Sequence, residues 1–235
     1  MWWFAALHAN LLMLYRRLVP CLSGTGKLLD AGCGTGGFLA RLAEHMPGTE
    51  AIGLDADETA CRWAAEKSAQ PVCAGSVNAL PFKDAVFAAI VSIDVLCHGG
   101  VDEARALGQF HRCLRVGGIL ILNLPAYRWL MSRHDTAVYN VRRYTATEVT
   151  HLLRAAGFHP IFVSYWNIVL FPLMVVTRKL LPAGSGSDVR LHSGIVEAAC
   201  RAAAAVERGL MRAGIRFPFG GSVLAVAAKP ASAHV

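Results

Sequence analysis

Apolar and polar positions alternate along this chain in blocks that predict an α/β protein. Seven short apolar runs predict strands near 27–31, 51–55, 71–74, 87–93, 117–123, 159–165 and 222–228. Between them, apolar residues recur with helical spacing and predict helices at 36–46, 57–68, 101–115 and 146–156. This alternation is typical of a doubly wound, seven-stranded, mostly parallel sheet, which is the fold class we expect.

An apolar segment precedes the first predicted strand. Trp2–Leu18 predicts an N-terminal helix within residues 1–20. Arg16 and Arg17 follow the apolar stretch instead of preceding it, and no small-residue cleavage site is evident, so the segment is a poor secretion signal.

A helical insertion over residues 166–220, both apolar and basic, is predicted before the last strand. It begins with Trp166–Leu181 and continues with an amphipathic helix over His192–Arg216. The stretch 155–177 has no Asp, Glu, Lys or Arg, but glycine and proline interrupt it. We therefore expect a strand and a short interfacial helix, not a membrane span, and we expect the insertion to form a membrane-facing lid.

Composition narrows the class of protein. A length of 235 residues suits a single domain, 1–235, and 54% hydrophobic residues exclude disorder. The net charge is +7, and residues 151–235 hold 9 Lys and Arg against 3 Asp and Glu, which suits an anionic membrane surface or substrate. Seven cysteines without a C-x-x-C pair suggest neither a disulfide framework nor a zinc site, so we expect a cytoplasmic protein without a metal.

A glycine-rich loop follows the first predicted strand. Gly32, Gly34 and Gly36 let the backbone approach a ligand, and the N-terminus of the next helix favours an anion. The spacing of Gly32, Gly34 and Gly37 also satisfies the dinucleotide fingerprint G-x-G-x-x-G, which leaves a nicotinamide cofactor open. Asp30 favours the other interpretation, because a carboxylate repels a pyrophosphate but suits the ammonium group of an amino-acid cofactor.

The D-x-G-x-G-x-G pattern from Asp30 to Gly36 resembles the first motif of the class I S-adenosylmethionine-dependent methyltransferases, including those of ubiquinone and menaquinone synthesis. The resemblance covers about residues 20–165 and 217–230. It implies S-adenosyl-L-methionine as cofactor, with S-adenosyl-L-homocysteine as product. The residues expected to bind it are Asp30, Gly32, Cys33, Gly34, Gly36, Phe38, Asp55, Ala56, Ser76, Val77 and Asp94.

Two of these positions have a second interpretation. Asp55 ends the second predicted strand, where a carboxylate accepts both ribose hydroxyls of a nucleoside cofactor. It is equally placed to cap the next helix, unless Asp57 or Thr59 does so. Ser76 stands where the family usually has an acidic residue for the adenine amine, and Val77 is expected to pack on the ring.

The segment Ile93–His98 resembles the family's segment along the methionine side of the cofactor. Cys97 stands where relatives have glutamate, so the segment does not suggest a metal site. His98 is a candidate base, with capping of the next helix as the alternative.

Residues 134–145 resemble a motif of a bacterial methyltransferase subgroup associated with lipid or surface-glycan pathways. His134 and Asp135 are candidates to remove an acceptor proton. The expected acceptor-binding residues are Tyr139, Arg142, Arg143 and Tyr144. The alternative is a solvated loop in which Thr145 and Glu148 form a capping box.

These patterns predict an enzyme that transfers a methyl group by in-line displacement to a small, lipophilic or lipid-linked acceptor. We expect it in the cytoplasm, peripheral to the inner face of the membrane. No nucleic-acid partner is expected, because the basic third of the chain is apolar and lacks a polar basic stripe. The alternatives are a non-catalytic S-adenosylmethionine-binding protein, a nucleic-acid methyltransferase and a nicotinamide oxidoreductase.

Overall fold

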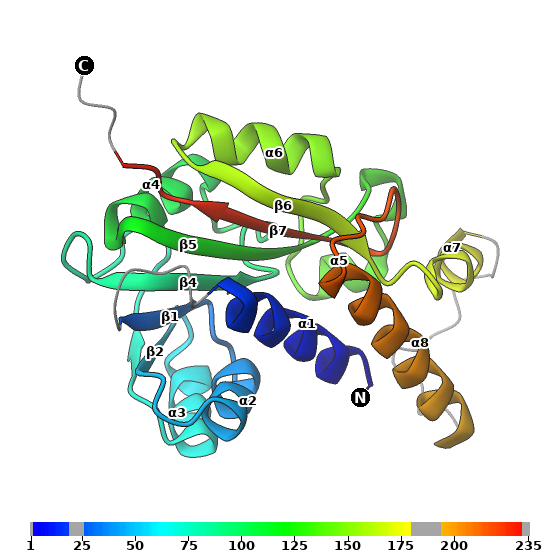
Figure 1. The fold of residues 1–235 in the computed structure, drawn as a ribbon, viewed down its shortest axis with the longest axis horizontal. Coiled ribbons are helices and arrows are strands. Elements are labelled where there is room, and N and C mark those ends of the chain that lie inside the picture. The colour runs from blue at the N-terminus through cyan, green and yellow to red at the C-terminus, as the bar shows by residue number, and fades with distance from the viewer. Residues whose placement is uncertain (1, 19–25, 180–193, 232–235) are drawn as a thin grey trace.

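The computed structural model describes residues 2–18, 26–179 and 194–231. It contains one seven-stranded sheet with the order β3-β2-β1-β4-β5-β7-β6 (Figure 1). The strands are β1 (Lys27–Ala31), β2 (Ala51–Asp55), β3 (Val72–Ala74), β4 (Phe87–Ile93), β5 (Leu114–Pro125), β6 (His159–Trp166) and β7 (Ser222–Ala228). β7 runs antiparallel to both of its neighbours, and the other pairs are parallel. The predicted fold class is therefore confirmed.

Helices cover both faces of this sheet. They are α1 (Trp2–Leu18), α2 (Gly37–His45), α3 (Glu58–Ser68), α4 (Glu103–Cys113), α5 (Arg133–Ala137), α6 (Ala146–Ala155), α7 (Phe171–Lys179) and α8 (Gly194–Arg212), with a 3-10 turn, η2, at Arg128–Leu130. The helices α4 and α6 lie on one face of the sheet, and α1, α2 and α8 lie on the other (Figure 1). Their apolar side chains pack into two separate cores, one on each face. Each strand therefore alternates its side chains between two buried layers.

Three boundaries differ from the expected ones. β5 begins at Leu114 and continues to Pro125, since its pairing with β7 extends it at the carboxyl end. Trp166 ends β6, and the following helix begins only at Phe171. The insertion thus contains α7 and α8, while residues 180–193 lie outside the described residues.

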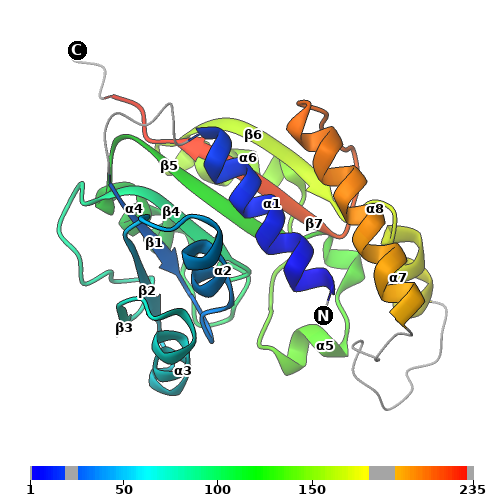
Figure 2. The same cartoon turned by 60° about the horizontal axis from the view of Figure 1, so that its bottom comes forward.

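The apolar face of α1 is part of the core. Leu7 and Leu11 are fully buried, and α1 lies beside α8 on the same face of the sheet (Figure 2). The basic end of α1 binds neighbouring backbone: Arg17 Nη1 donates to the carbonyl of Arg212 at 2.9 Å, and Arg16 donates to the carbonyl of His45. Most apolar residues of α1 therefore belong to the core, whereas Phe4 near its start is 51% exposed.

A buried carboxylate joins α8 to the end of β6. Glu207 is 4% exposed and accepts hydrogen bonds from the backbone N–H groups of Asn167, at 3.2 Å, and Ile168. Asn167 has a left-handed backbone with φ 63°, so the chain turns sharply there. The insertion is consequently anchored at the carboxyl edge of the sheet. Among the described residues, no helix combines the length and apolar character needed to cross a membrane.

Candidate active site

The sheet order reverses between β1 and β4, and the glycine loop lies at this point. In open α/β sheets, ligands bind at the carboxyl ends of the strands beside such a reversal. Gly32, Gly34 and Gly36 all have positive φ, of 85°, 52° and 75°. A Cβ atom at Gly32 would lie 2.2 Å from Val95 Cγ2, whereas one at Gly34 would meet nothing within 4 Å. Gly32 is thus required by packing, while Gly34 leaves open space for a ligand.

Asp30 is the buried acid of this site. It is 1% exposed, and neither carboxyl oxygen has a hydrogen-bond partner among the described residues. Burial, helped by the charge of Asp55, raises the pKa of Asp30 to about 8. An unpartnered buried carboxyl is costly, so this position fits a ligand that brings a cation. The ammonium group of S-adenosylmethionine meets that requirement.

Asp55 supports the loop from β2. Its carboxylate accepts the N–H of Gly34 at 2.8 Å and the N–H of Asp57 at 3.0 Å. Asp57 caps α3 by accepting the N–H groups of Thr59 and Ala60. Asp55 is therefore not the cap, and its partly exposed carboxylate retains acceptor capacity for ribose hydroxyls. Ala56, beside it, is exposed.

Two residues predicted to bind the cofactor belong to the core. The Phe38 side chain is 2% exposed, with its ring 5.9 Å from the ring of His8. The Cys33 thiol is buried, and burial raises its pKa, so it stays protonated. At both positions only the backbone is left to face a ligand.

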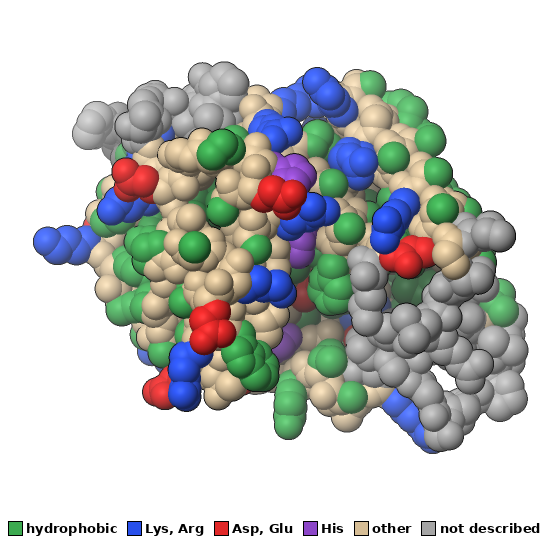
Figure 3. Space-filling view, turned by 90° about the horizontal axis from the view of Figure 1, so that it is seen from below, with side chains coloured by type: hydrophobic (Ala, Val, Ile, Leu, Met, Phe, Trp, Pro, Cys, Tyr) green, Lys and Arg blue, Asp and Glu red, His purple; other side chains and the backbone are tan. Residues whose placement is uncertain are grey.

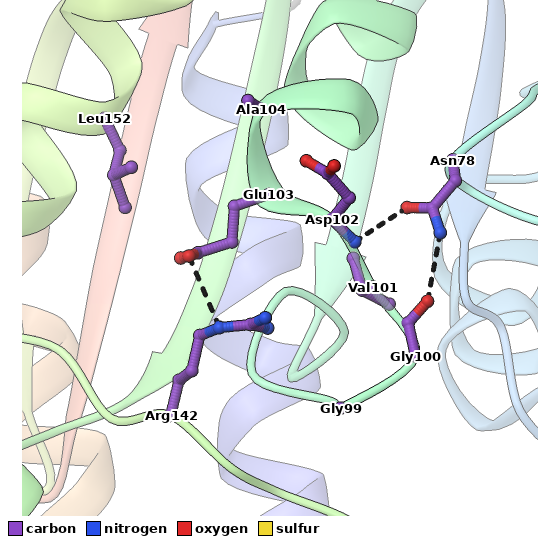
Figure 4. A pocket seen from close by; sticks show the side chains of 9 residues that line it. All are labelled: Asn78, Gly99, Gly100, Val101, Asp102, Glu103, Ala104, Arg142 and Leu152. Carbon is purple, nitrogen blue, oxygen red and sulfur yellow. Dashed lines mark hydrogen bonds and ion pairs between the residues drawn. The ribbon is translucent and has the colours of Figure 1, made fainter.

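The loop after β3 is tied to the start of α4 by a residue that the sequence did not single out. Asn78 Nδ2 donates to Gly100 O at 3.0 Å, and Asn78 Oδ1 accepts the Asp102 N–H at 3.0 Å (Figure 4). These residues line an open cavity of about 520 Å³. Ser76 is exposed and Val77 is buried, which suits a polar and an apolar contact to adenine.

A polar relay crosses the carboxyl edge from β6 to β4. Trp166 Nε1 donates to Asn123 Oδ1 at 2.7 Å, and Asn123 Nδ2 donates to Asp94 Oδ1 at 2.9 Å. Trp166 and Asn123 are fully buried, whereas Asp94 is partly exposed. Burial raises the pKa of Asp94 to about 7, although the hydrogen bond from Asn123 and the charge of Arg143 oppose the shift.

Asp135 lies in a buried ion pair, which does not fit the base role predicted for it. Its Oδ1 accepts Arg143 Nε at 3.0 Å and Nη2 at 2.7 Å, and its Oδ2 accepts two hydrogen bonds from Ser132. Burial raises its pKa, but these hydrogen bonds outweigh that effect and hold the pKa below its usual value. His134 precedes it in α5, and the His134 side chain lies outside the described part of the structure.

Arg142, Arg143 and Tyr144, which are predicted to bind the acceptor, all bind the protein itself. Arg143 and Tyr144 are buried, whereas the Arg142 side chain is 29% exposed and lines the cavity beside α4. Arg143 Nη1 donates to Ala126 O, and Arg142 Nη1 donates to Leu96 O and His98 O. The Tyr144 hydroxyl lies 2.9 Å from Leu96 O and 2.7 Å from Glu103 Oε1. The segment therefore fastens the loop after β4, and the capping box of Thr145 and Glu148 is present.

Two predicted residues remain accessible at this edge. Tyr139 is 78% exposed, with φ 59°. His98 is partly exposed, and burial lowers its pKa while the charge of Asp55 opposes the shift. His98 does not cap α4, since Asp102 does.

An aromatic cluster, which we call the edge cluster, lies at the carboxyl ends of β5 and β6. It consists of Tyr127, Trp129, Tyr165, Phe171 and Phe219. Tyr127 and Tyr165 stack with ring centroids 5.1 Å apart and planes at 11°. Its members are up to 92 positions apart in the sequence, from 127 to 219, so no local pattern could have found it. They meet because the ends of β5 and β6 and the start of β7 share one edge.

The open space at Gly34 generates a first prediction. We expect Gly34→Ala to weaken S-adenosylhomocysteine binding at least ten-fold in calorimetry, because its Cβ would occupy ligand space. Gly48→Ala is the matched control, since Gly48 also has a positive φ, of 92°, and no atom within 4 Å of its Cβ position. Gly48→Ala introduces the same backbone strain, about 1–2 kcal/mol, but should keep the affinity of the parent for S-adenosylhomocysteine. Equal affinity in both variants would contradict the site.

The raised pKa of Asp30 generates a second prediction. Below about 8 the free protein holds this carboxyl protonated. A bound ammonium group favours the ionised form, so binding releases the proton and affinity falls as pH is lowered. Calorimetry at about pH 6.5 in buffers of different ionisation enthalpy should report release of about one proton. Asp30→Asn should release none. Equal proton release in both proteins would mean that Asp30 does not meet the ammonium group.

The comparisons with known proteins agree with this geometry. Residues 29–122 match the family model described as a methyltransferase domain. Over 170 residues the chain is 40% identical to the demethylmenaquinone methyltransferase of Roseiflexus castenholzii, covering 70% of this chain and 69% of that protein. Over 154 residues it is 27% identical to 24-methylenesterol C-methyltransferase 2 of Oryza sativa, covering 56% of this chain and 41% of the rice protein. The chain thus spans less than half of the rice relative's length.

A solved structure shares the fold. The geranyl diphosphate C-methyltransferase of Streptomyces coelicolor A3(2), in complex with Mg²⁺, geranyl diphosphate and S-adenosyl-L-homocysteine, superposes with a TM-score of 0.58. The two chains are 17% identical, and the match covers 92% of this chain and 76% of the other. Together with the glycine loop and the buried Asp30, these matches lead to one conclusion: the chain belongs to the class I S-adenosylmethionine-dependent methyltransferases.

Proposed function

We propose that this protein transfers a methyl group to a small lipophilic acceptor whose ring or prenyl chain rests on the edge cluster. The observation that carries the proposal is the position of these aromatic side chains. The backbone N–H of Tyr127 donates to Tyr144 O. The edge cluster therefore adjoins the end of residues 134–145, the segment predicted to bind the acceptor. Apolar rings at such an edge suit a flat or unsaturated apolar ligand. The names of the relatives, which include a menaquinone precursor and a sterol, support this acceptor class.

The residues divide the work between cofactor and acceptor. Asp30 binds the ammonium group, Asp55 the ribose and Val77 one face of the adenine. Bound S-adenosylmethionine supplies an electrophilic methyl group on a sulfonium. The protein mainly aligns the acceptor and excludes water, which for well-oriented reactants accounts for a large part of the rate. His98 and Tyr139 line the acceptor side.

The other candidate functions are less well supported. A nucleic-acid methyltransferase needs exposed cations beside its acceptor site, but Arg142 and Arg143, the cations of residues 134–145, bind groups within the protein. A nicotinamide oxidoreductase would place a pyrophosphate next to the buried Asp30. A non-catalytic binder would not need an edge cluster beside the cofactor residues.

The acceptor class is the subject of a third prediction. We expect methylated product, detected by mass spectrometry, from a short-chain demethylmenaquinol and none from glycine or histamine. Phe171 lies centrally in the edge cluster, with its ring 5.7 Å from those of Tyr127 and Phe219. Phe171→Ala should raise the acceptor KM about ten-fold, or ~1.4 kcal/mol.

The control for this variant is Phe162→Ala, which removes a partly buried phenylalanine of β6 outside the edge cluster. It should keep the acceptor KM of the parent, and both variants should bind S-adenosylhomocysteine within three-fold of the parent. Turnover of the polar acceptors alone, or an unchanged KM in Phe171→Ala, would refute the proposed acceptor site.

We also propose that the acceptor is taken from an anionic membrane surface. Two members of the edge cluster, Trp129 and Phe219, are 48% and 41% exposed, and Val169 and Val176, before and within α7, are 56% and 40% exposed. We call these four residues the α7 patch. Lys and Arg side chains are spread over the face that carries α1, α2 and α8 (Figure 3). An apolar patch beside cations suits a peripheral contact with anionic lipid, to which each basic residue near the surface adds ~1 kcal/mol.

Vesicle flotation provides a fourth prediction. The protein should float with phosphatidylcholine vesicles that contain phosphatidylserine, and salt should weaken this binding. Val169→Ser with Val176→Ser should abolish flotation. The control pair is Val116→Ser with Val86→Ser, whose parent side chains are 56% and 38% exposed at the opposite edge of the sheet. Equal flotation of the two double variants, or none by the parent, would exclude this membrane contact.

A further inference from the structure

We propose that Asp94 is the base of the reaction, and that the acceptor therefore carries a weakly acidic group such as a phenol, a hydroquinol or an activated C–H. This proposal rests on the proposed methyl transfer and adds the residue that activates the acceptor. It starts from the position of Asp94, directly after β4 at the reversal of the strand order. The next residue, Val95, packs against Gly32 of the cofactor loop. Asp94 is thus one residue away from a direct contact with the cofactor loop, and we assign it to the acceptor in place of the cofactor contact that the sequence predicts.

The backbone at Asp94 is held in an unusual conformation. Its φ is 53°, in the left-handed region, and its N–H donates to Asn123 O at 2.9 Å. Residues other than glycine, asparagine and aspartate rarely adopt this backbone conformation. Such strain persists only where the surroundings impose it, and it concentrates at functional sites.

The relay from Trp166 orients the carboxyl group. An indole N–H can only donate a hydrogen bond. The Asn123 amide must therefore present its oxygen to Trp166 Nε1. The amide N–H₂ group must then face Asp94, where it binds Oδ1. Among the described residues, no donor binds the second oxygen, Oδ2. Since Asp94 is partly exposed, Oδ2 is the atom that can accept a proton from an acceptor.

The charged groups around Asp94 set its proton affinity. Burial raises its pKa to about 7, Asn123 and Arg143 lower it, and the charge of Asp135 raises it again. The Cys97 thiol nearby has a pKa raised by burial and by Asp94, so it stays neutral. A base whose pKa lies near the working pH is efficient, because it is substantially ionised yet still holds a proton well.

The other candidate bases fit less well. Asp135 is held in its ion pair with Arg143, with both oxygens hydrogen-bonded. Among the described residues, no hydrogen bond or ion pair holds the His98 side chain in one orientation, whereas Asp94 is held by a relay of two buried side chains. In the proposed step, the acceptor O–H or C–H bond breaks, its proton passes to Asp94 Oδ2, and its electron pair stays on the acceptor atom as the nucleophile. The proton later leaves to solvent.

Asp94→Asn is the decisive variant, since asparagine keeps the shape of the side chain and tolerates a positive φ. We expect kcat with a short-chain demethylmenaquinol to fall at least about 100-fold. The acceptor KM and the affinity for S-adenosylhomocysteine should stay within three-fold. Asp84→Asn, which removes an exposed carboxylate paired with Arg112, is the control and should keep the parent kcat.

A second measurement does not depend on turnover. In the parent protein with ¹³C-labelled aspartate carboxyl groups, one resonance that is absent from Asp94→Asn should titrate near pH 7, and Asn123→Ala should raise its midpoint. A midpoint in the ordinary range of aspartate, or a kcat of Asp94→Asn within five-fold of the parent, would overturn the proposal. Failure of the proposed function has a different signature, namely that the parent protein methylates none of the lipophilic acceptors.

Discussion

The contact between Gly32 and Val95 is the constraint on which the site depends. β1 and β4 are neighbouring parallel strands, about 4.8 Å apart, and the chain leaves them at the same edge toward helices on opposite faces. The loops after β1 and β4 therefore start close together and then diverge. Only a glycine at position 32 leaves room for Val95 there. The cofactor loop and the turn that carries Asp94 consequently form one unit. A side chain at residue 32 would displace both.

A second layer of support comes from the segment that follows β5. Its charged residues are used inside the protein: Asp135 and Arg143 form a buried pair, and Arg142 binds carbonyl groups of the loop after β4. A buried ion pair is costly to desolvate, and here additional hydrogen bonds from Ser132 and to Ala126 offset that cost. The exposed side chains at this edge include the aromatic rings of Trp129 and Tyr139, which supports the apolar acceptor proposed above.

The helical insertion is attached to the same edge. Glu207 binds the backbone at the end of β6, and a Cβ atom at Gly220 would lie 2.3 Å from Trp166 O. The chain before β7 therefore passes close against Trp166, the first residue of the polar relay. In this way α7 and α8 are anchored to the residues that orient Asp94. The cofactor side and the acceptor side thus share their supports.

The sequence by itself determined the sheet and the glycine loop, and it placed Asp30 and Asp55 at the carboxyl ends of β1 and β2 beside that loop. These features are local: strand periodicity, a run of glycines and acidic residues at strand ends each lie within a few positions. It also determined the capping box of Thr145 and Glu148. Only the tertiary structure decided how charged residues such as Arg143 are used, because the chemistry of a guanidinium does not reveal whether its partner is a ligand or Asp135. The edge cluster and the relay from Trp166 to Asp94 were likewise decided by strand order, which brings β5, β6 and β7 to one edge.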